Sequence, residues 1–182
     1  MGKINDINWL FNKYYGENPE LRRIVTVHSE EVAKKALEIC KRKNLDLNEE
    51  DVYCAAMLHD IGVVKCNAPD IHAYGELPYI KHGIEGGKIL RENGLSRWSS
   101  ICETHTGAGI SKEEVKNQNL PLPNIDMLPE TILEKLICYA DKFFSKSHDL
   151  KREKTVEEIM SQMSRHGEDS LARFLELHSL FS

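Results

Sequence analysis

The residues best suited to chemistry in this chain are a histidine and an aspartate side by side, His59 and Asp60, at the end of an apolar run. Neutral imidazole and carboxylate groups are both good ligands for a divalent cation. Adjacent side chains on a helix point about 100° apart, so they converge on one ion most easily where a helix ends. Gly62 is expected to supply that end by adopting the left-handed conformation that closes helices. Taken alone, the pair is equally typical of helix-capping residues.

Further candidate ligands lie at the long intervals expected if successive helices each deliver one or two side chains to a common centre: His28, His82, His105 and Asp141. A lone histidine such as His28, on the apolar stripe of a helix, is more often a hydrogen-bonded core residue than a ligand. His82 and His105 each lie near a helix end and a glycine, where each alone is explained by a hydrogen bond to a carbonyl. Asp141 lies beside an apolar face, where a carboxylate is costly unless it is paired or bound to a cation.

Together these six residues suit one or two divalent ions. The set contains no thiolate, so a hard or borderline ion is expected, among Fe, Mn, Mg, Ni and Zn. The chemistry that such a site supports is attack of a metal-activated water on a phosphoryl group. A metal lowers the pKa of the water, and two ions can clamp the attacking and leaving oxygens.

Helices must position these residues. Apolar stripes and capping residues predict helices over about 5–16, 19–43, 48–59, 78–93 and 96–105, followed by three that begin with the capping boxes Ser111/Glu114, Thr131/Glu134 and Thr155/Glu158. Residues 63–77 are expected to form an irregular loop over the site. Strand-like alternation is missing, so the sequence predicts an all-α fold, a single-domain helical bundle over residues 1–182.

Composition limits the class of protein. The 182 residues carry a net charge of −5, which argues against a nucleic-acid-binding surface over the whole chain. The amino-terminal residues lack an apolar signal core, and no apolar run approaches membrane-spanning length. The five cysteines include no C-x-x-C pair, which indicates reduced thiols and predicts a cytoplasmic protein.

The order His28, His59-Asp60, Asp141 resembles the HD-domain superfamily of metal-dependent phosphohydrolases, and His59-Asp60-Ile61-Gly62 matches its H-D-I-G variant. His82 and His105 resemble the two extra histidines of its six-ligand, binuclear members. Among these, the bacterial symmetrical diadenosine tetraphosphate hydrolases carry a segment similar to His105-Thr106-Gly107-Ala108. The resemblance covers about residues 24–147. Val63-Val64-Lys65 after Gly62, the lack of a second histidine after His105 and the lack of a G-Y-P segment argue against a cyclic-di-GMP phosphodiesterase.

The resemblance implies a first metal held by His28, His59, Asp60 and Asp141, and a second held by Asp60, His82 and His105, with Asp60 bridging. It implies catalytic roles for Asp60, His82 and Thr106, although Thr106 is equally explained as a helix cap. Lys65, Lys142 and Lys146 are candidates for phosphate contact, although each taken singly is more typical of a solvated surface lysine. The expected partners are a small phosphorylated substrate, in the first place a nucleotide, and a second copy of the chain in a homodimer. No nucleic-acid duplex and no membrane are expected.

The leading hypothesis is therefore a phosphohydrolase acting on a nucleotide or dinucleotide polyphosphate. A di-iron oxygenase with the same six ligands is a rival, which iron-dependent oxygen consumption would identify. The other rival is a non-catalytic metal- or nucleotide-binding module, although such a module need not keep a complete ligand set.

Overall fold

The computed structural model describes residues 3–147 and 149–182. His148, expected to be a surface or partly buried residue, lies outside them. The α-helices within the described residues are α1 (Lys3–Tyr15), α2 (Pro19–Lys43), α3 (Glu49–Leu58), α4 (His82–Glu92), α5 (Ser99–Thr104), α6 (Lys112–Asn117), α7 (Ile132–Asp141), α8 (Val156–His166) and α9 (Glu168–Phe181). Short 3-10 helices lie at η1 (Ile61–Lys65), η2 (Pro69–Ile71), η3 (Tyr79–Lys81) and η4 (Ser96–Trp98).

The prediction of an all-α fold is confirmed, with one small addition. Strands β1 (Asn67–Ala68) and β2 (Ala73–Tyr74) pair antiparallel inside the segment expected to be an irregular loop. Across the described ranges, no helix combines the length and the apolar character needed to cross a bilayer.

The helix boundaries follow from capping residues. All three predicted capping boxes are present, at the starts of α6, α7 and α8. In each box the hydroxyl accepts a hydrogen bond from the backbone N–H three residues later, and the glutamate accepts one from the backbone N–H of the cap. Asn18 and Asn48 cap α2 and α3 in a similar way through their side-chain oxygens.

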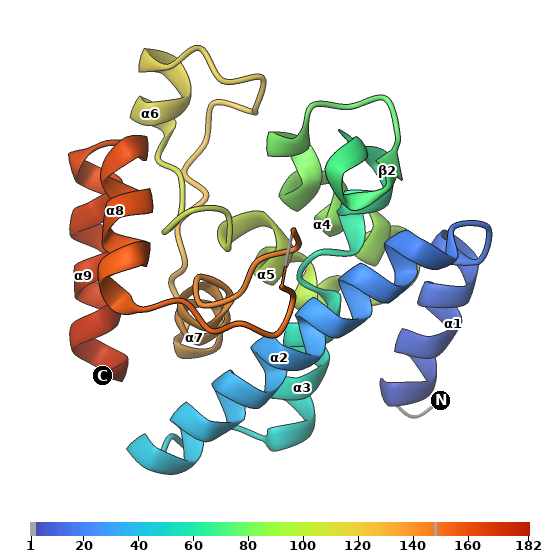
Figure 1. The fold of residues 1–182 in the computed structure, drawn as a ribbon, viewed down its shortest axis with the longest axis horizontal. Coiled ribbons are helices and arrows are strands. Elements are labelled where there is room, and N and C mark those ends of the chain that lie inside the picture. The colour runs from blue at the N-terminus through green and yellow to red at the C-terminus, as the bar shows by residue number, and fades with distance from the viewer. Residues whose placement is uncertain (1–2, 148) are drawn as a thin grey trace.

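The long helix α2 crosses the molecule and packs against both α3 and α7 (Figure 1). Helix α4 packs on η1 and on α5, and α1 packs on α3. Helices α8 and α9 form an antiparallel pair at one edge, and α9 packs on α7 (Figure 1). The carboxyl ends of α3, α5 and α7 and the start of α4 thereby come close to the middle of α2.

Gly62 acts through its small size. It lies within η1 and does not adopt a positive φ, so the prediction of a left-handed helix end there is wrong. A Cβ atom added to Gly62 would collide with the backbone oxygen of His82 and the backbone nitrogen of Gly86. The missing side chain therefore lets α4 lie directly on η1, which places His82 close to Asp60.

Helix α1 buries a different tyrosine from the one expected. The apolar pattern of residues 5–16 predicts an inner face formed by Ile7, Leu10, Phe11 and Tyr14. In the structure Tyr15 is the fully buried tyrosine, and Tyr14 is only partly buried. The Tyr15 ring packs edge-on against Phe11, with 5.3 Å between the ring centroids. The helix therefore buries residues four apart.

Candidate metal centre

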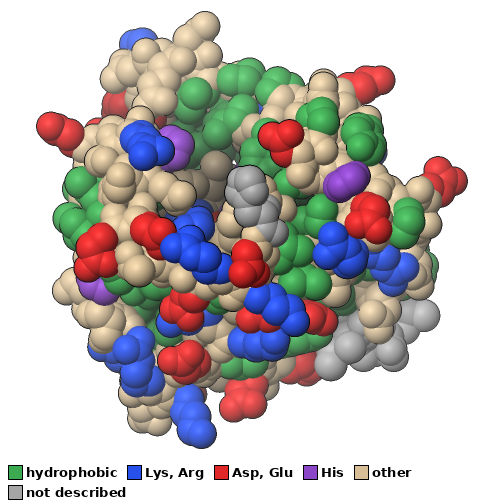
Figure 2. Space-filling model, in the orientation of Figure 1, with side chains coloured by type: hydrophobic (Ala, Val, Ile, Leu, Met, Phe, Trp, Pro, Cys, Tyr) green, Lys and Arg blue, Asp and Glu red, His purple; other side chains and the backbone are tan. Residues whose placement is uncertain are grey.

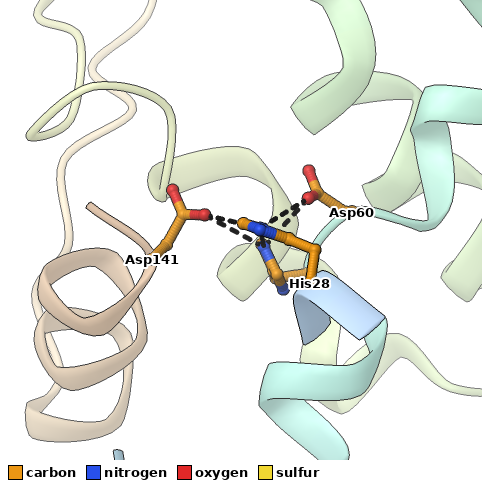
Figure 3. Close-up of side chains that lie close together, drawn as sticks. His28, Asp60 and Asp141 are labelled. Atoms are coloured by element: carbon orange, nitrogen blue, oxygen red, sulfur yellow. Dashed lines mark hydrogen bonds and ion pairs between the residues drawn. The ribbon is translucent and has the colours of Figure 1, made fainter. Parts of the chain in front are cut away.

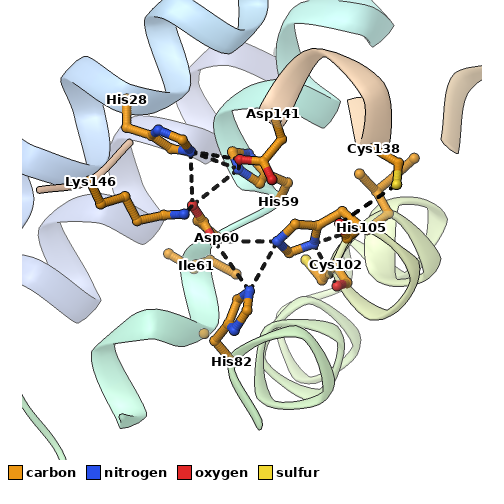
Figure 4. A network of polar contacts seen from close by, with 12 residues as sticks. His28, His59, Asp60, Ile61, His82, Cys102, His105, Cys138, Asp141 and Lys146 are labelled. Carbon is orange, nitrogen blue, oxygen red and sulfur yellow. Dashed lines mark hydrogen bonds and ion pairs between the residues drawn. The ribbon is translucent and has the colours of Figure 1, made fainter. Parts of the chain in front are cut away.

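Six buried side chains from five segments converge at the middle of the molecule (Figure 4). They form two groups that share one carboxylate: His28, His59, Asp60 and Asp141, and Asp60, His82 and His105. Within each group the candidate ligand atoms all lie within 4.8 Å of one another. These are the six residues that the sequence indicated as candidate metal ligands.

The first group is organised around two carboxylate oxygens. Asp141 Oδ1 lies 2.9 Å from His28 Nε2 and 3.4 Å from His59 Nε2. Asp60 Oδ2 lies 3.3 Å from His28 Nε2 and 3.0 Å from His59 Nε2. Figure 3 shows Asp60 and Asp141 on opposite sides of the His28 ring, each pointing toward it. Two carboxylates and two imidazoles thus face one small volume.

The second group uses the other oxygen of the same aspartate. Asp60 Oδ1 lies 3.4 Å from His105 Nε2 and 3.6 Å from His82 Nε2. The two imidazole Nε2 atoms are 3.0 Å apart. Asp60 therefore stands between the two groups, with one oxygen directed to each.

Backbone carbonyls fix the orientation of three of the imidazoles. Nδ1 of His59 lies 2.6 Å from the carbonyl oxygen of Ala56, and Nδ1 of His82 lies 2.8 Å from that of Tyr79. Nδ1 of His105 lies 2.8 Å from the carbonyl oxygen of Cys102. A carbonyl can only accept, so each Nδ1 carries the hydrogen, and in the neutral ring Nε2 presents a lone pair to the centre. This is the tautomer and orientation of a histidine ligand.

This arrangement fits a bound cation. With both Nδ1 atoms donating to carbonyls, the neutral rings of His82 and His105 have no hydrogen left to place between their Nε2 atoms. Their lone pairs then face each other at 3.0 Å, which a shared cation would relieve. The buried Asp60 carboxylate has an ion pair with Lys146 at 2.7 Å, but neither of its oxygens has a hydrogen bond of good geometry within the described residues. The donor set and these unsatisfied atoms fit one or two divalent ions.

The pKa values of two imidazoles in the centre are shifted by burial and by neighbouring charged groups. Burial, assisted by the nearby His105 ring, lowers the pKa of His82 to about 3, so this imidazole is neutral at ordinary pH. Burial also opposes a charge on His59, but the carboxylates of Asp60 and Asp141 outweigh it and raise its pKa to about 9. The carboxylates that draw a proton to this position would equally attract a metal ion.

The three candidate lysines have different surroundings. Lys146 Nζ lies 2.7 Å from Asp60 Oδ2, and its side chain is 14% exposed. Lys142 is buried; its Nζ lies 2.7 Å from Asp141 Oδ2 and donates a hydrogen bond to the carbonyl oxygen of His105. Lys65 is exposed on η1, and no contact with the six-residue centre is seen for it among the described residues. The structure thus brings Lys146 to the centre, uses Lys142 to hold Asp141 and leaves Lys65 outside.

Thr106 and two aromatic residues complete the surroundings. Thr106 is partly buried and lines a cavity together with His82 and Tyr79. The Tyr79 ring stacks on His82, with 4.7 Å between the centroids. Tyr15 donates from its hydroxyl toward the backbone oxygens of Asp60 and Ile61, at 3.3 and 3.1 Å. The sequence reasoning missed both tyrosines, because an apolar stripe does not reveal where a buried hydroxyl finds its acceptor.

Comparison with known proteins gives relatives that include two tRNA methyltransferases and one uncharacterized protein. A tRNA (cytidine(56)-2'-O)-methyltransferase of Thermoplasma volcanium is 34% identical over 157 residues, 85% of this chain and 41% of that protein. One of Picrophilus torridus is 32% identical over 161 residues, 87% of this chain and 42% of that protein. An uncharacterized protein of Methanocaldococcus jannaschii is 36% identical over 121 residues, 64% of each chain. No solved structure matches the chain significantly.

This chain spans about two-fifths of the length of the two methyltransferases, so their named activity is not transferred to it. The family model of the HD domain matches residues 25–145. That range contains all six residues of the buried centre, from His28 to Asp141, and ends before α8 and α9. The match covers well over half of the chain, and the chain belongs to the HD domain family.

Proposed function

We propose that this chain is a metal-dependent phosphohydrolase that acts on a nucleotide or dinucleotide polyphosphate. The observation that supports this most strongly is the position of Asp60, whose two oxygens face two separate groups of imidazole ligands. A carboxylate in that position joins two cation sites. When bound, divalent ions in such a centre lower the pKa of a coordinated water and stabilise negative charge on phosphoryl oxygens.

The roles proposed for the side chains follow from their contacts. His28, His59 and Asp141 would hold a first ion, His82 and His105 would hold a second, and Asp60 would be available to both. Lys142 acts by orienting Asp141, because its ammonium group contacts the oxygen that faces away from His28 and His59. Lys146 is the lysine for phosphate contact, since it reaches the centre and also lines a cavity. Thr106 is proposed to orient a reacting group beside His82.

The substrate class is supported by charge. The chain is acidic overall, so a polyphosphate needs a local concentration of cations. Lys146 supplies one beside the centre, and Lys154 lines the same cavity. Diadenosine tetraphosphate is the first compound to test, because the segment around His105 and Thr106 is similar to a segment of the symmetrical diadenosine tetraphosphate hydrolases.

A phosphate ester carried by tRNA is the second candidate substrate. It is favoured by the names of two relatives, which describe proteins acting on the 2'-oxygen of a cytidine in tRNA. The same centre would serve this reaction, because hydrolysis of a phosphate ester needs the same ions whichever alcohol leaves.

The test is a substrate panel with the purified full chain loaded separately with Mn²⁺, Fe²⁺, Mg²⁺, Ni²⁺ and Zn²⁺. The panel contains nucleoside mono-, di- and triphosphates, dinucleoside polyphosphates and tRNA with a terminal phosphate, with products identified by mass spectrometry. The control is Asp60→Asn, which keeps the shape of the side chain but removes its charge. Release of phosphate or of a nucleotide by the wild-type protein, lost in Asp60→Asn, is expected.

Two other outcomes would count against the proposal. Iron-dependent oxygen consumption without phosphate release would favour the oxygenase. Metal and nucleotide binding without turnover of any compound would favour a binding module.

A further inference from the structure

A cavity of about 410 Å³ opens beside the second ligand group. His82 belongs both to that group and to the cavity wall, so the cavity lies next to the centre. Thr106 and Tyr79 also line this cavity. The lining further includes Gln118 at the end of α6, and His166 and Ser170 from α8 and α9. The volume lies within the range of about 300–1,000 Å³ that is typical for small-molecule sites.

The lining of this cavity carries no lysine or arginine among the described residues. Ile80, Ile110 and Leu120 supply apolar surface, and the Gln118 amide supplies a hydrogen-bonding edge. Its one acidic residue, Glu114, is already paired, because both carboxylate oxygens lie 2.8 Å from Arg173 Nη2. The walls therefore suit an uncharged group with flat apolar faces and polar edges.

A second cavity, of about 360 Å³, shares one lining residue with the first, Tyr79. Here Lys146 and Lys154 are accompanied by the hydroxyls of Ser145 and Ser147, and Asp70 is the one acidic residue among the described lining residues. Figure 2 shows one face of the molecule with a hollow near its middle, and Lys and Arg side chains lie beside the hollow with Asp and Glu side chains among them. These walls suit an anion with several oxygens.

We propose that the cavity beside His82 binds the nucleoside part of the substrate, while its phosphates extend past Tyr79 toward Lys146 and Lys154. This inference rests on the proposed phosphohydrolase function and adds the direction in which the substrate lies. This assignment of the two parts of the substrate follows from charge complementarity. The neutral walls bind the uncharged nucleoside, and the lysines bind the anionic phosphates.

Arg173 is the positioning residue for this cavity. Its guanidinium donates to the carbonyl oxygens of Ala108 and Gly109, at 3.1 and 2.9 Å, and to Glu114. One side chain of α9 thus holds both the loop after Thr106 and the first turn of α6. Helices α8 and α9 lie outside the range that the family model matches, so the family match does not account for this wall of the cavity.

The test measures equilibrium binding to the Mn²⁺-loaded full chain with two kinds of probe: the four ribonucleosides, each alone, and inorganic tripolyphosphate. Gln118→Trp fills the mouth of the neutral cavity from an exposed position, so folding is expected to be kept. Ile110→Trp fills it from within, and its backbone pairing with Met127 does not depend on the side chain. Lys154→Gln tests the cationic cavity. Arg97→Ala, an exposed arginine paired with Asp51, is the control for general effects of a surface substitution.

At least one nucleoside is expected to bind the wild-type protein and to bind at least tenfold more weakly in Gln118→Trp and Ile110→Trp. The binding of tripolyphosphate should be at least tenfold weaker in Lys154→Gln and unchanged in the two tryptophan variants. The inference is overturned if no nucleoside binds, or if both tryptophan variants bind nucleoside as the wild type does. Hydrolysis of any phosphorylated compound tests the proposed function separately. If the chain hydrolyses such a compound but does not bind nucleoside in the neutral cavity, only this inference is rejected.

Discussion

Lys146 Nζ lies 2.7 Å from Asp60 Oδ2, the oxygen that also contacts the Nε2 atoms of His28 and His59. The lysine ammonium group and the first ligand group therefore share one carboxylate oxygen. The Asp60 side chain is fully buried and the Lys146 side chain nearly so, which makes their attraction strong and poorly screened by solvent. A cation that binds to Asp60 must compete with this ammonium group for the same oxygen.

Lys146→Met is expected to destabilise the metal-free protein by about 3–5 kcal/mol, because removal of one partner leaves a buried charge uncompensated. The metal-loaded protein should lose less stability on the same substitution, since bound ions neutralise Asp60 in place of the lysine. Denaturant unfolding in the presence of a chelator and of excess Mn²⁺ measures both losses. Lys88→Met, which removes an exposed partner of Glu85, is the control and should have little effect. Equal losses under the two conditions would show that Lys146 and the ion do not compete.

The second ligand group can be separated from the first by substitution. His82→Ala together with His105→Ala should remove about one ion per chain and leave the ion held by His28, His59, Asp60 and Asp141. Turnover should fall steeply, because the lost ion helps to stabilise charge on the phosphoryl group. Metal per folded chain, measured before and after substitution, is the readout. A count near one in both proteins would return these two histidines to a structural role.

Much of the fold could be predicted because its signals are local. Each capping box joins residues three apart, so the starts of α6, α7 and α8 could be read from Ser111, Thr131 and Thr155. The six residues of the centre could be named because polar side chains at apolar helix ends, and His28 on the apolar stripe of a helix, are conspicuous. Their convergence depends on how α2, α4, α5 and α7 pack, which spacing alone does not determine.

The sequence-based predictions were wrong or incomplete at positions whose role is determined by tertiary packing. Gly62 was expected to end a helix, but the approach of α4 determines its role, and nothing in the local pattern records that approach. Lys65, Lys142 and Lys146 look alike in sequence, yet one is exposed, one holds Asp141 and one reaches Asp60. The contribution of Arg173 could not be foreseen, because it lies 59 residues from its partner Glu114.

The contact between η1 and α4 can be tested at Gly62. Gly62→Ala places a methyl group against the backbone of His82 and Gly86, so α4 must move away from η1. Because the colliding atoms are backbone atoms, rotation of a side chain cannot relieve the clash, and we expect a loss of at least about 1–3 kcal/mol. The displacement separates His82 from Asp60, so affinity should fall more for the second ion than for the first. Gly94→Ala is a comparison for the stability loss: it has open space around it and a φ of 75°, so it tests backbone strain without a clash. Equal weakening of both ions in Gly62→Ala would contradict this account.

The pairing of Arg173 with Glu114 predicts a pH dependence of stability. Burial tends to raise the pKa of Glu114, but hydrogen bonds from Arg173 and from Ser111 outweigh it and lower the pKa below its ordinary value of 4.5. A carboxyl group whose pKa is lowered on folding contributes stability that is fully present above about pH 4.5 and is lost as the pH falls through its folded pKa.

Arg173→Met should therefore cost about 2–4 kcal/mol near pH 7, since a largely buried ion pair and two hydrogen bonds to carbonyls are lost together. The difference from the wild type should shrink below about pH 4.5, where Glu114 in the variant becomes protonated and no longer needs a cation. Chemical denaturation at a series of pH values measures this difference. Arg152→Met is the matched control, because Arg152 forms a similar pair with Glu158 but both side chains are well exposed, so a much smaller loss is expected. In turnover assays Arg173→Met should raise KM more than it lowers kcat, because the cavity wall shifts while the six residues of the centre stay in place. A loss of stability that is the same at every pH would show that the pair with Glu114 is not what Arg173 contributes.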